Sequence, residues 1–170
     1  MVKRFKGGGS LGNGGYYVAM TPQRIWALDL DGTLLRLPVD IEAVRAGVVE
    51  LFSRVGVVAT PRPILSGIQA AARAAAPEDL AEQARWRARG HGIIEAAELE
   101  AAASARPCPG ARAFLEALGQ EPVAIVTNNA AAPARAALER CGLLPGNLVK
   151  IIGREPHRPA KSSPEPLLRA

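Results

Sequence analysis

The sequence predicts an α/β fold in which a Rossmann-like parallel sheet carries an inserted all-helical block. Short apolar runs at 24–28, 122–127 and 149–152 are typical of buried strands. From residue 108 onward strand and helix patterns alternate, which is typical of a parallel sheet. Residues 37–107, between the first and second strands, have a helical pattern throughout. One domain with a helical insertion is therefore expected.

The composition is that of a folded protein with a nearly neutral body. A chain of 170 residues buries roughly 70% of its unfolded surface, and 48% of these residues are hydrophobic, which excludes global disorder. No apolar run approaches the roughly 18 residues of a membrane span. The net charge is +5, but three of the 21 basic residues lie in the first 23 residues, which contain no acid. Two cysteines without a CxxC pair indicate reduced thiols and a cytoplasmic protein.

Residues 1–23 are predicted to form a flexible, glycine-rich tail. The segment 7–12 satisfies G-x-G-x-x-G, but no strand precedes it and no helical pattern follows, so a dinucleotide site is not expected. The tail also lacks the apolar stretch of a signal peptide. Met20 is a second candidate for the start of the protein.

The helical block is expected to contain three helices. Asp40 is a candidate N-cap for the first, because apolar residues follow it at helical spacing. The second is expected to begin with a capping box formed by Ser66 and Gln69. The third covers 78–105, with a break at the glycines of 90–92.

After this block the chain is expected to return to the sheet through a linker at 106–110. Helical patterns end near Gly119, cover 132–140 and begin again at residue 164. A polar loop over 153–163 follows the third strand. This order of elements supports a parallel sheet with helical crossovers.

Polar side chains follow each of the three predicted strands. Asp29 and Asp31 follow the first, Thr127 and Asn128 follow the second, and the loop after the third contains Lys161. The carboxyl ends of parallel strands meet at one edge of a sheet, where functional groups gather. Two acids, a hydroxyl beside backbone amides, and a lysine are the groups that phosphoryl transfer requires.

The same segments resemble, in order, three motifs of the haloacid dehalogenase (HAD) superfamily. Residues 29–35 (DLDGTLL) are similar to its first motif, 125–129 (IVTNN) to its second and 161–168 (KSSPEPLL) to its third. The linker 106–110 resembles the usual return to the core. The likeness covers about 24–170 and is to phosphoglycolate-phosphatase-like members with a helical cap.

This resemblance implies a Mg²⁺-dependent phosphomonoester hydrolase that acts on a small phosphorylated metabolite through an aspartyl-phosphate. Asp29 would be the nucleophile and a metal ligand, and Asp31 the general acid/base, whose backbone carbonyl also binds the metal. Thr127 and the Asn128 amide would hold the phosphoryl group, and Lys161 would neutralise its charge. The acid at position 31 favours ester hydrolysis, because the dehalogenases themselves have none there.

The resemblance also divides the chain into a core (24–36 and 108–170) and a cap (37–107) that closes over the substrate. The family's fourth motif, which supplies further acids for Mg²⁺, is missing. The nine residues after Lys161 are too few to finish a helix and add a strand, and Glu165 is the only acid among them. The chain is therefore expected to be C-terminally truncated, with an open sheet edge through which it can self-associate.

Three other functions remain open. A phosphomutase would use the same aspartate, and a truncated, non-catalytic remnant would bind phosphate or a partner without turnover. The basic residues around Trp86 permit nucleic-acid stacking, but Arg85 follows Glu82 at helical spacing, so a solvated face and no nucleic-acid partner are expected. His91 and His157 lack a ligand spacing and are expected to be loop or surface residues.

Overall fold

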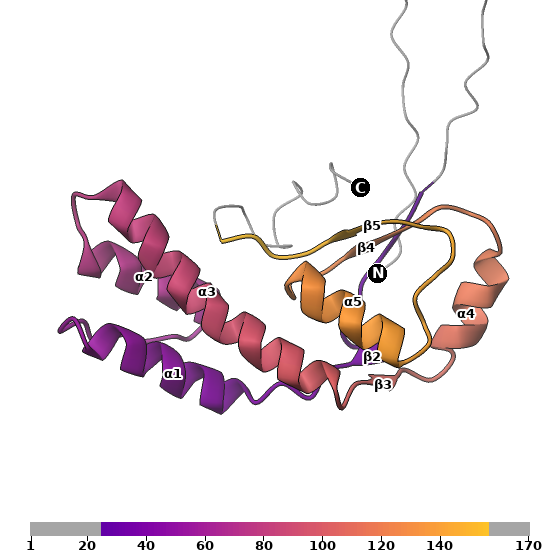
Figure 1. The fold of residues 1–170 in the computed structure, drawn as a ribbon, viewed down its shortest axis with the longest axis horizontal. Coiled ribbons are helices and arrows are strands. Elements are labelled where there is room, and N and C mark those ends of the chain that lie inside the picture. Colours follow the sequence, from indigo (N-terminus) through magenta and orange to yellow (C-terminus); the bar gives the residue numbers. More distant parts are fainter. Residues whose placement is uncertain (1–24, 157–170) are drawn as a thin grey trace, which may run out of the picture.

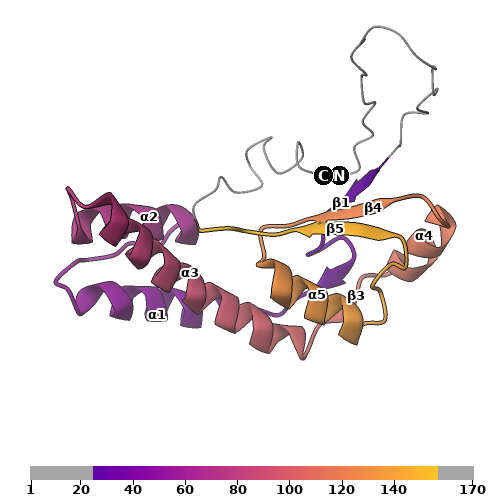
Figure 2. The ribbon, with the colours of Figure 1, turned by 45° about the horizontal axis from the view of Figure 1, so that its top comes forward.

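The computed structural model describes residues 25–156 and contains a three-stranded parallel sheet. The strands are β1 (Trp26–Leu28), β4 (Val123–Val126) and β5 (Leu148–Ile152), in the order β1-β4-β5. All three run in the same direction, as Figure 1 and Figure 2 show. The predicted α/β class and parallel sheet are confirmed.

The register of the strands aligns their carboxyl ends. Leu28 of β1 lies opposite Ile125 of β4, and Ile125 lies opposite Ile151 of β5. All four residues of β4 are buried, as expected for an apolar central strand with a neighbour on each side. The residues that follow the three strands therefore emerge at the same edge.

Three helices form a separate bundle beside the sheet (Figure 1). They are α1 (Ile41–Ser53), α2 (Ile64–Ala75) and α3 (Leu80–Ala102). Asp40 caps α1 as predicted, because its Oδ1 accepts the Ala43 N–H at 2.9 Å. The bundle has its own apolar cluster, which includes Val44, Val48, Phe52, Ile68, Trp86 and Ile94.

The predicted capping box of α2 is wrong. The N-cap is Pro63, whose backbone is extended, and no side chain caps the helix. Ser66 lies inside the first turn, where its hydroxyl donates to the Pro63 carbonyl oxygen at 3.1 Å, so Gln69 has no capping partner there. The proline ring fixes φ at the N-cap, and the helix starts three residues earlier than the serine pattern indicates.

The predicted break at 90–92 is also wrong, because α3 is continuous through both glycines. Gly90 permits a close contact between two helices: a Cβ atom there would lie 2.7 Å from Ile68 Cγ2 of α2. Tertiary packing therefore explains this glycine, and it outweighs the low helix propensity of the residue.

A short antiparallel ribbon joins the bundle to the sheet. It consists of β2 (Leu35–Arg36) and β3 (Arg106–Pro107), the latter within the segment predicted as a linker. Immediately after β3, Cys108 donates its N–H to the Leu34 carbonyl oxygen at 2.9 Å. The segments that leave and re-enter the sheet region are thus held side by side.

Two further helices pack with the sheet. They are α4 (Ala111–Leu118) and α5 (Ala131–Arg140), both close to the predicted ranges. In Figure 2, α5 lies along one face of the sheet. The sheet has its own apolar cluster, and the last turn of α3 is part of it. This helix therefore runs from the bundle into the core. The cluster includes Leu28, Leu30, Ala101, Ala102, Ile125, Ala134 and Leu138.

Several predictions concern residues outside the described range. These are the tail 1–23, most of the loop 153–163 with Lys161 and His157, and the helix from residue 164. Within residues 25–156, no helix combines the length and the apolar character needed to cross a bilayer.

Candidate active site at the carboxyl edge of the sheet

Asp29 and Asp31 lie in the turn that directly follows β1. Asp29 is half-buried: its Oδ1 accepts the Leu30 N–H at 2.8 Å, and its Oδ2 is 3.5 Å from the Thr33 hydroxyl that donates to it. Asp31 is exposed, and its Oδ1 accepts the Leu37 N–H at 3.0 Å. The turn therefore fixes both carboxylates through local N–H and O–H donors.

Thr127 follows β4 and is buried, with 4% of its surface exposed. Its hydroxyl accepts the Asn129 N–H at 3.1 Å and donates to Asn129 Oδ1 at 2.8 Å. Its own N–H donates to the Ile152 carbonyl oxygen of β5 at 3.0 Å. The side chain is thus held at the base of a turn in which Asn128 is exposed.

The parallel register brings Asp29 and Thr127 to the ends of neighbouring strands. Since Leu28 pairs with Ile125, Asp29 is level with the last residue of β4, and Thr127 lies one residue beyond it. Helix α5 begins just after this turn, with Ala130 as its N-cap. The positive end of its macrodipole therefore lies at the same edge of the sheet.

The carboxylates at this edge fit a magnesium ion by the chemistry of their donors. Mg²⁺ is commonly bound through one or two carboxylates, with substrate phosphate oxygens and water as its other ligands. Asp29 would supply one such carboxylate, and Asp31 would supply its backbone carbonyl oxygen, as the resemblance of the motif implies. Residues 25–156 contain no group of three or more His, Cys, Asp or Glu side chains that could hold a metal.

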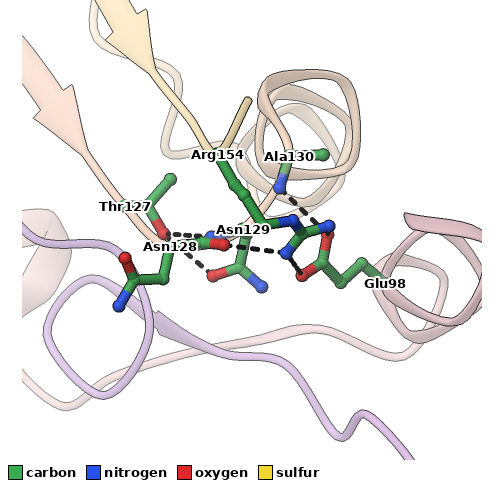
Figure 3. A network of polar contacts seen from close by, with 6 residues as sticks. All are labelled: Glu98, Thr127, Asn128, Asn129, Ala130 and Arg154. Atoms are coloured by element: carbon green, nitrogen blue, oxygen red, sulfur yellow. Dashed lines mark hydrogen bonds and ion pairs between the residues drawn. The ribbon is translucent and has the colours of Figure 1, made fainter. Parts of the chain in front are cut away.

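Two residues that sequence reasoning did not select form a buried ion pair beside the Thr127 turn (Figure 3). Arg154 donates from Nη1 to Glu98 Oε1 at 2.6 Å and from Nη2 to Glu98 Oε2 at 3.1 Å. Both side chains are only 5% exposed. The spacing of Glu98 from Ile94 and Ala101 places it on the buried face of α3, and this is the signal that could have identified it.

His91 also differs from its prediction, since it lies within α3 and is half-buried. Its Nδ1 atom is buried and has no hydrogen-bond partner among the described residues. The pKa of His91 is lowered from 6.5 to about 4, chiefly by burial and then by the charges of Arg154 and Arg87. The imidazole is therefore neutral at pH 7.

Residues 24–170 match the family of haloacid dehalogenase-like hydrolases. The chain belongs to this family of enzymes, in agreement with the resemblance of its motifs. No curated protein sequence matches the chain.

Several solved structures have a similar fold. CbbY from Rhodobacter sphaeroides, in complex with xylulose-1,5-bisphosphate, is 17% identical with a TM-score of 0.52; the match covers 86% of this chain and 69% of that chain. A predicted phosphoglycolate phosphatase from Haemophilus somnus is 19% identical with a TM-score of 0.47, covering 85% and 68%. L-2-haloacid dehalogenase from Xanthobacter autotrophicus is 20% identical with a TM-score of 0.44, covering 85% and 62%. The similarity to CbbY supports the fold.

Proposed function

We propose that the chain is a phosphomonoester hydrolase that works through an aspartyl-phosphate on Asp29. The observation that carries this proposal is the placement of Asp29 and Asp31 at the end of β1, beside the Thr127 turn at the end of β4. Membership of a hydrolase family supports the same reaction class. The substrate is proposed to be a small phosphorylated metabolite.

The first half of the reaction breaks the phosphate ester. A carboxylate oxygen of Asp29 attacks phosphorus while the bond from phosphorus to the ester oxygen breaks. Asp31 donates a proton to the leaving oxygen, so the alcohol departs neutral.

The second half regenerates the enzyme. A water molecule attacks the phosphorus of the aspartyl-phosphate, and Asp31 takes a proton from that water. Phosphate leaves, and Asp29 returns to its carboxylate form. One water is consumed, and one alcohol and one phosphate are produced.

The turn after β4 is proposed to bind the phosphoryl oxygens. The Thr127 hydroxyl would redirect its proton from Asn129 Oδ1 to a phosphoryl oxygen, and the Asn128 N–H would donate to another. Lys161 is proposed to neutralise the remaining charge. When held by the Asp29 carboxylate and the Asp31 backbone carbonyl, Mg²⁺ would supply charge neutralisation between the carboxylate and the phosphate.

The bundle α1–α3 is proposed to act as a cap, with residues 37–107 as the cap and 24–36 and 108–170 as the core. Closing a cap over a small substrate excludes water from the reacting groups. A cytoplasmic location is part of the proposal, because Cys108 and Cys141 are free thiols, which suits a reducing compartment.

A second candidate function is phosphate or partner binding without turnover. It is favoured by one observation: within residues 25–156, Asp29 and Asp31 have no third acid beside them as a metal ligand. A HAD-type phosphomutase would share Asp29 and its phosphorylation. The two catalytic alternatives differ in whether the phosphoryl group passes to water or to a second hydroxyl.

The proposal is tested by assaying the 170-residue chain with Mg²⁺ and a panel of small phosphomonoesters, beside Asp29→Asn. Weak phosphate release that requires both Mg²⁺ and Asp29 is expected. Glu50→Gln, on the exposed surface of α1, serves as the matched control and should retain the rate. Equal rates in the chain and in Asp29→Asn would refute the proposal. Phosphate binding without any release would select the second candidate.

A further inference from the structure

Glu98 and Arg154 contact the turn that is proposed to bind phosphate, but neither lies in the motifs that identified it. We propose that this ion pair is a positioning pair, which holds the backbone of residues 127–130 in the conformation that binds phosphate. The inference rests on the proposed function of that turn. It concerns residues that act through the turn without touching the substrate.

The pair holds three successive backbone groups of the turn. Arg154 Nη1 donates to the Asn128 carbonyl oxygen at 2.8 Å, and Glu98 Oε2 accepts the Ala130 N–H at 2.9 Å. The backbone N–H of Arg154 donates to the Asn129 carbonyl oxygen at 2.8 Å. Figure 3 shows Glu98 and Arg154 beside this turn. The Thr127 hydroxyl, which is part of the turn, accepts the Asn129 N–H. Rotation of any peptide between 128 and 130 would break one of these contacts.

The burial of the pair argues for a role in positioning. Removing two charges from water is costly, and a buried ion pair is often no more stabilising than apolar residues of the same size. Both side chains are 5% exposed, so this cost applies here. What the pair provides, and apolar side chains would not, is the set of directional hydrogen bonds to Asn128 and Ala130.

The pair also connects two parts of the fold. Residues Trp86 and Ile94 of α3 pack in the cluster of the helical bundle, whereas Ala101 and Ala102 pack in the cluster around the sheet. Glu98 lies between these two groups, where α3 passes the carboxyl edge. The position of the turn is therefore set jointly by α3 and by the segment after β5.

The test measures the binding of inorganic phosphate to the full chain by calorimetry in the presence of Mg²⁺, together with the melting temperature. Glu98→Gln and Arg154→Met each break the pair and leave one buried partner, so both should lower the melting temperature. Each should weaken phosphate binding by roughly tenfold or more, the scale seen when residues that orient a binding group are removed.

The double variant Glu98→Met with Arg154→Met separates positioning from structural support. Two apolar side chains of similar size should restore much of the melting temperature, but the phosphate affinity should stay roughly tenfold weaker. Arg154→Lys is a second variant that separates positioning from structural support, because an ammonium lacks the planar fork that reaches Glu98 and Asn128 together. This variant should remain folded, and it should bind phosphate more weakly than the unsubstituted chain does.

The exposed pair of Glu50 and Arg54 on α1 provides the control. Glu50→Gln and Arg54→Met should leave phosphate affinity unchanged. Unchanged affinity in the double variant and in Arg154→Lys would overturn the inference while leaving the proposed function intact. Absence of phosphate binding by the unsubstituted chain would overturn the proposed function, and the inference with it.

Discussion

The hydroxyl of Thr127 has one role in the structure and a second role in the proposed reaction. In the structure it accepts the Asn129 N–H and donates to Asn129 Oδ1, which fixes the turn after β4. In the proposed reaction the same proton is donated to a phosphoryl oxygen. Substitution of the residue is therefore expected to change both the stability of the local fold and the affinity for phosphate.

Thr127→Val is expected to lower both quantities. It leaves the part-buried Asn129 N–H without its partner, which costs about 1–3 kcal/mol of unfolding free energy. It also removes the proposed donor to phosphate, so phosphate affinity should fall. Urea unfolding and calorimetry measure the two effects. Thr127→Ser keeps the hydroxyl and should retain phosphate binding; equal affinity in the valine and serine variants would contradict the role of the hydroxyl.

His91 should make the stability depend on pH in a defined window. Its pKa is lowered from 6.5 to about 4 in the folded protein, chiefly by burial and then by Arg154 and Arg87. Between these values the unfolded chain binds a proton at this position and the folded protein does not. The contribution of His91 is therefore complete above pH 6.5 and is lost as the pH falls toward 4.

The comparison is between the chain and His91→Gln, by urea unfolding at several pH values from 4 to 7. The variant is expected to lose less unfolding free energy over this range, because glutamine does not titrate. Carboxylates contribute equally to the unfolding free energies of the chain and of His91→Gln, so their contribution cancels when the two are subtracted. Identical pH dependence would show that His91 is not held neutral by its surroundings.

At the scale of the helix, the two glycines in the middle of α3 are predicted to respond differently to alanine. A Cβ atom at Gly90 would lie 2.7 Å from Cγ2 and 3.1 Å from Cγ1 of Ile68, and Ile68 is fully buried. Nothing lies within 4 Å of a Cβ atom at Gly92.

Gly90→Ala should therefore lower the unfolding free energy. The cost of overpacking, about 1–3 kcal/mol, exceeds the gain of roughly 1 kcal/mol in helix propensity. Gly92→Ala is the matched control and should raise it by about 0.5–1 kcal/mol. Thermal or urea unfolding measures both. Equal stabilisation by the two substitutions would contradict the close packing of α2 against α3.

The main elements could be predicted from the sequence because their signals are local. Apolar runs marked the three strands of the sheet, and Asp40 with the apolar spacing behind it marked α1. The continuity of α3 through Gly90 could not be predicted in this way, because it depends on a contact with Ile68 in another helix. The two-residue strands β2 and β3 are too short to show any periodicity.

The residues of the candidate site could also be predicted only where their signals are local. Asp29 and Thr127 were identified because each directly follows an apolar strand, and the register places them on neighbouring strands. Glu98 and Arg154 are 56 positions apart, and each resembles a solvated charge until the fold buries them together. The helical spacing of Glu98 could indicate that it is buried, but nothing in a single sequence indicates that it pairs with Arg154.

At the scale of the whole molecule, the sheet is predicted to mediate self-association. Within residues 25–156, β1 pairs with β4 on one side and has no strand partner on the other. An unpaired edge presents N–H and carbonyl groups that can pair with another chain. Sedimentation velocity at increasing protein concentration should therefore reveal dimers or larger species.

Association through the bundle is the alternative to association through the sheet. Val58 is 92% exposed in the bundle region, so Val58→Ser removes an apolar contact there without altering the sheet edge. The variant should associate as the unsubstituted chain does. A monomer at every concentration would contradict the prediction, and loss of association in Val58→Ser would assign it to the bundle.

The central claim is that Asp29 becomes phosphorylated during the reaction. The most direct measurement is to mix the chain with Mg²⁺ and a small phosphomonoester, quench in acid and map the peptides by mass spectrometry. One phosphoryl group is expected on the peptide that contains Asp29, and none in Asp29→Asn. Phosphate release without a phosphorylated Asp29 peptide, or an equal label in the Asp29→Asn variant, would contradict the account.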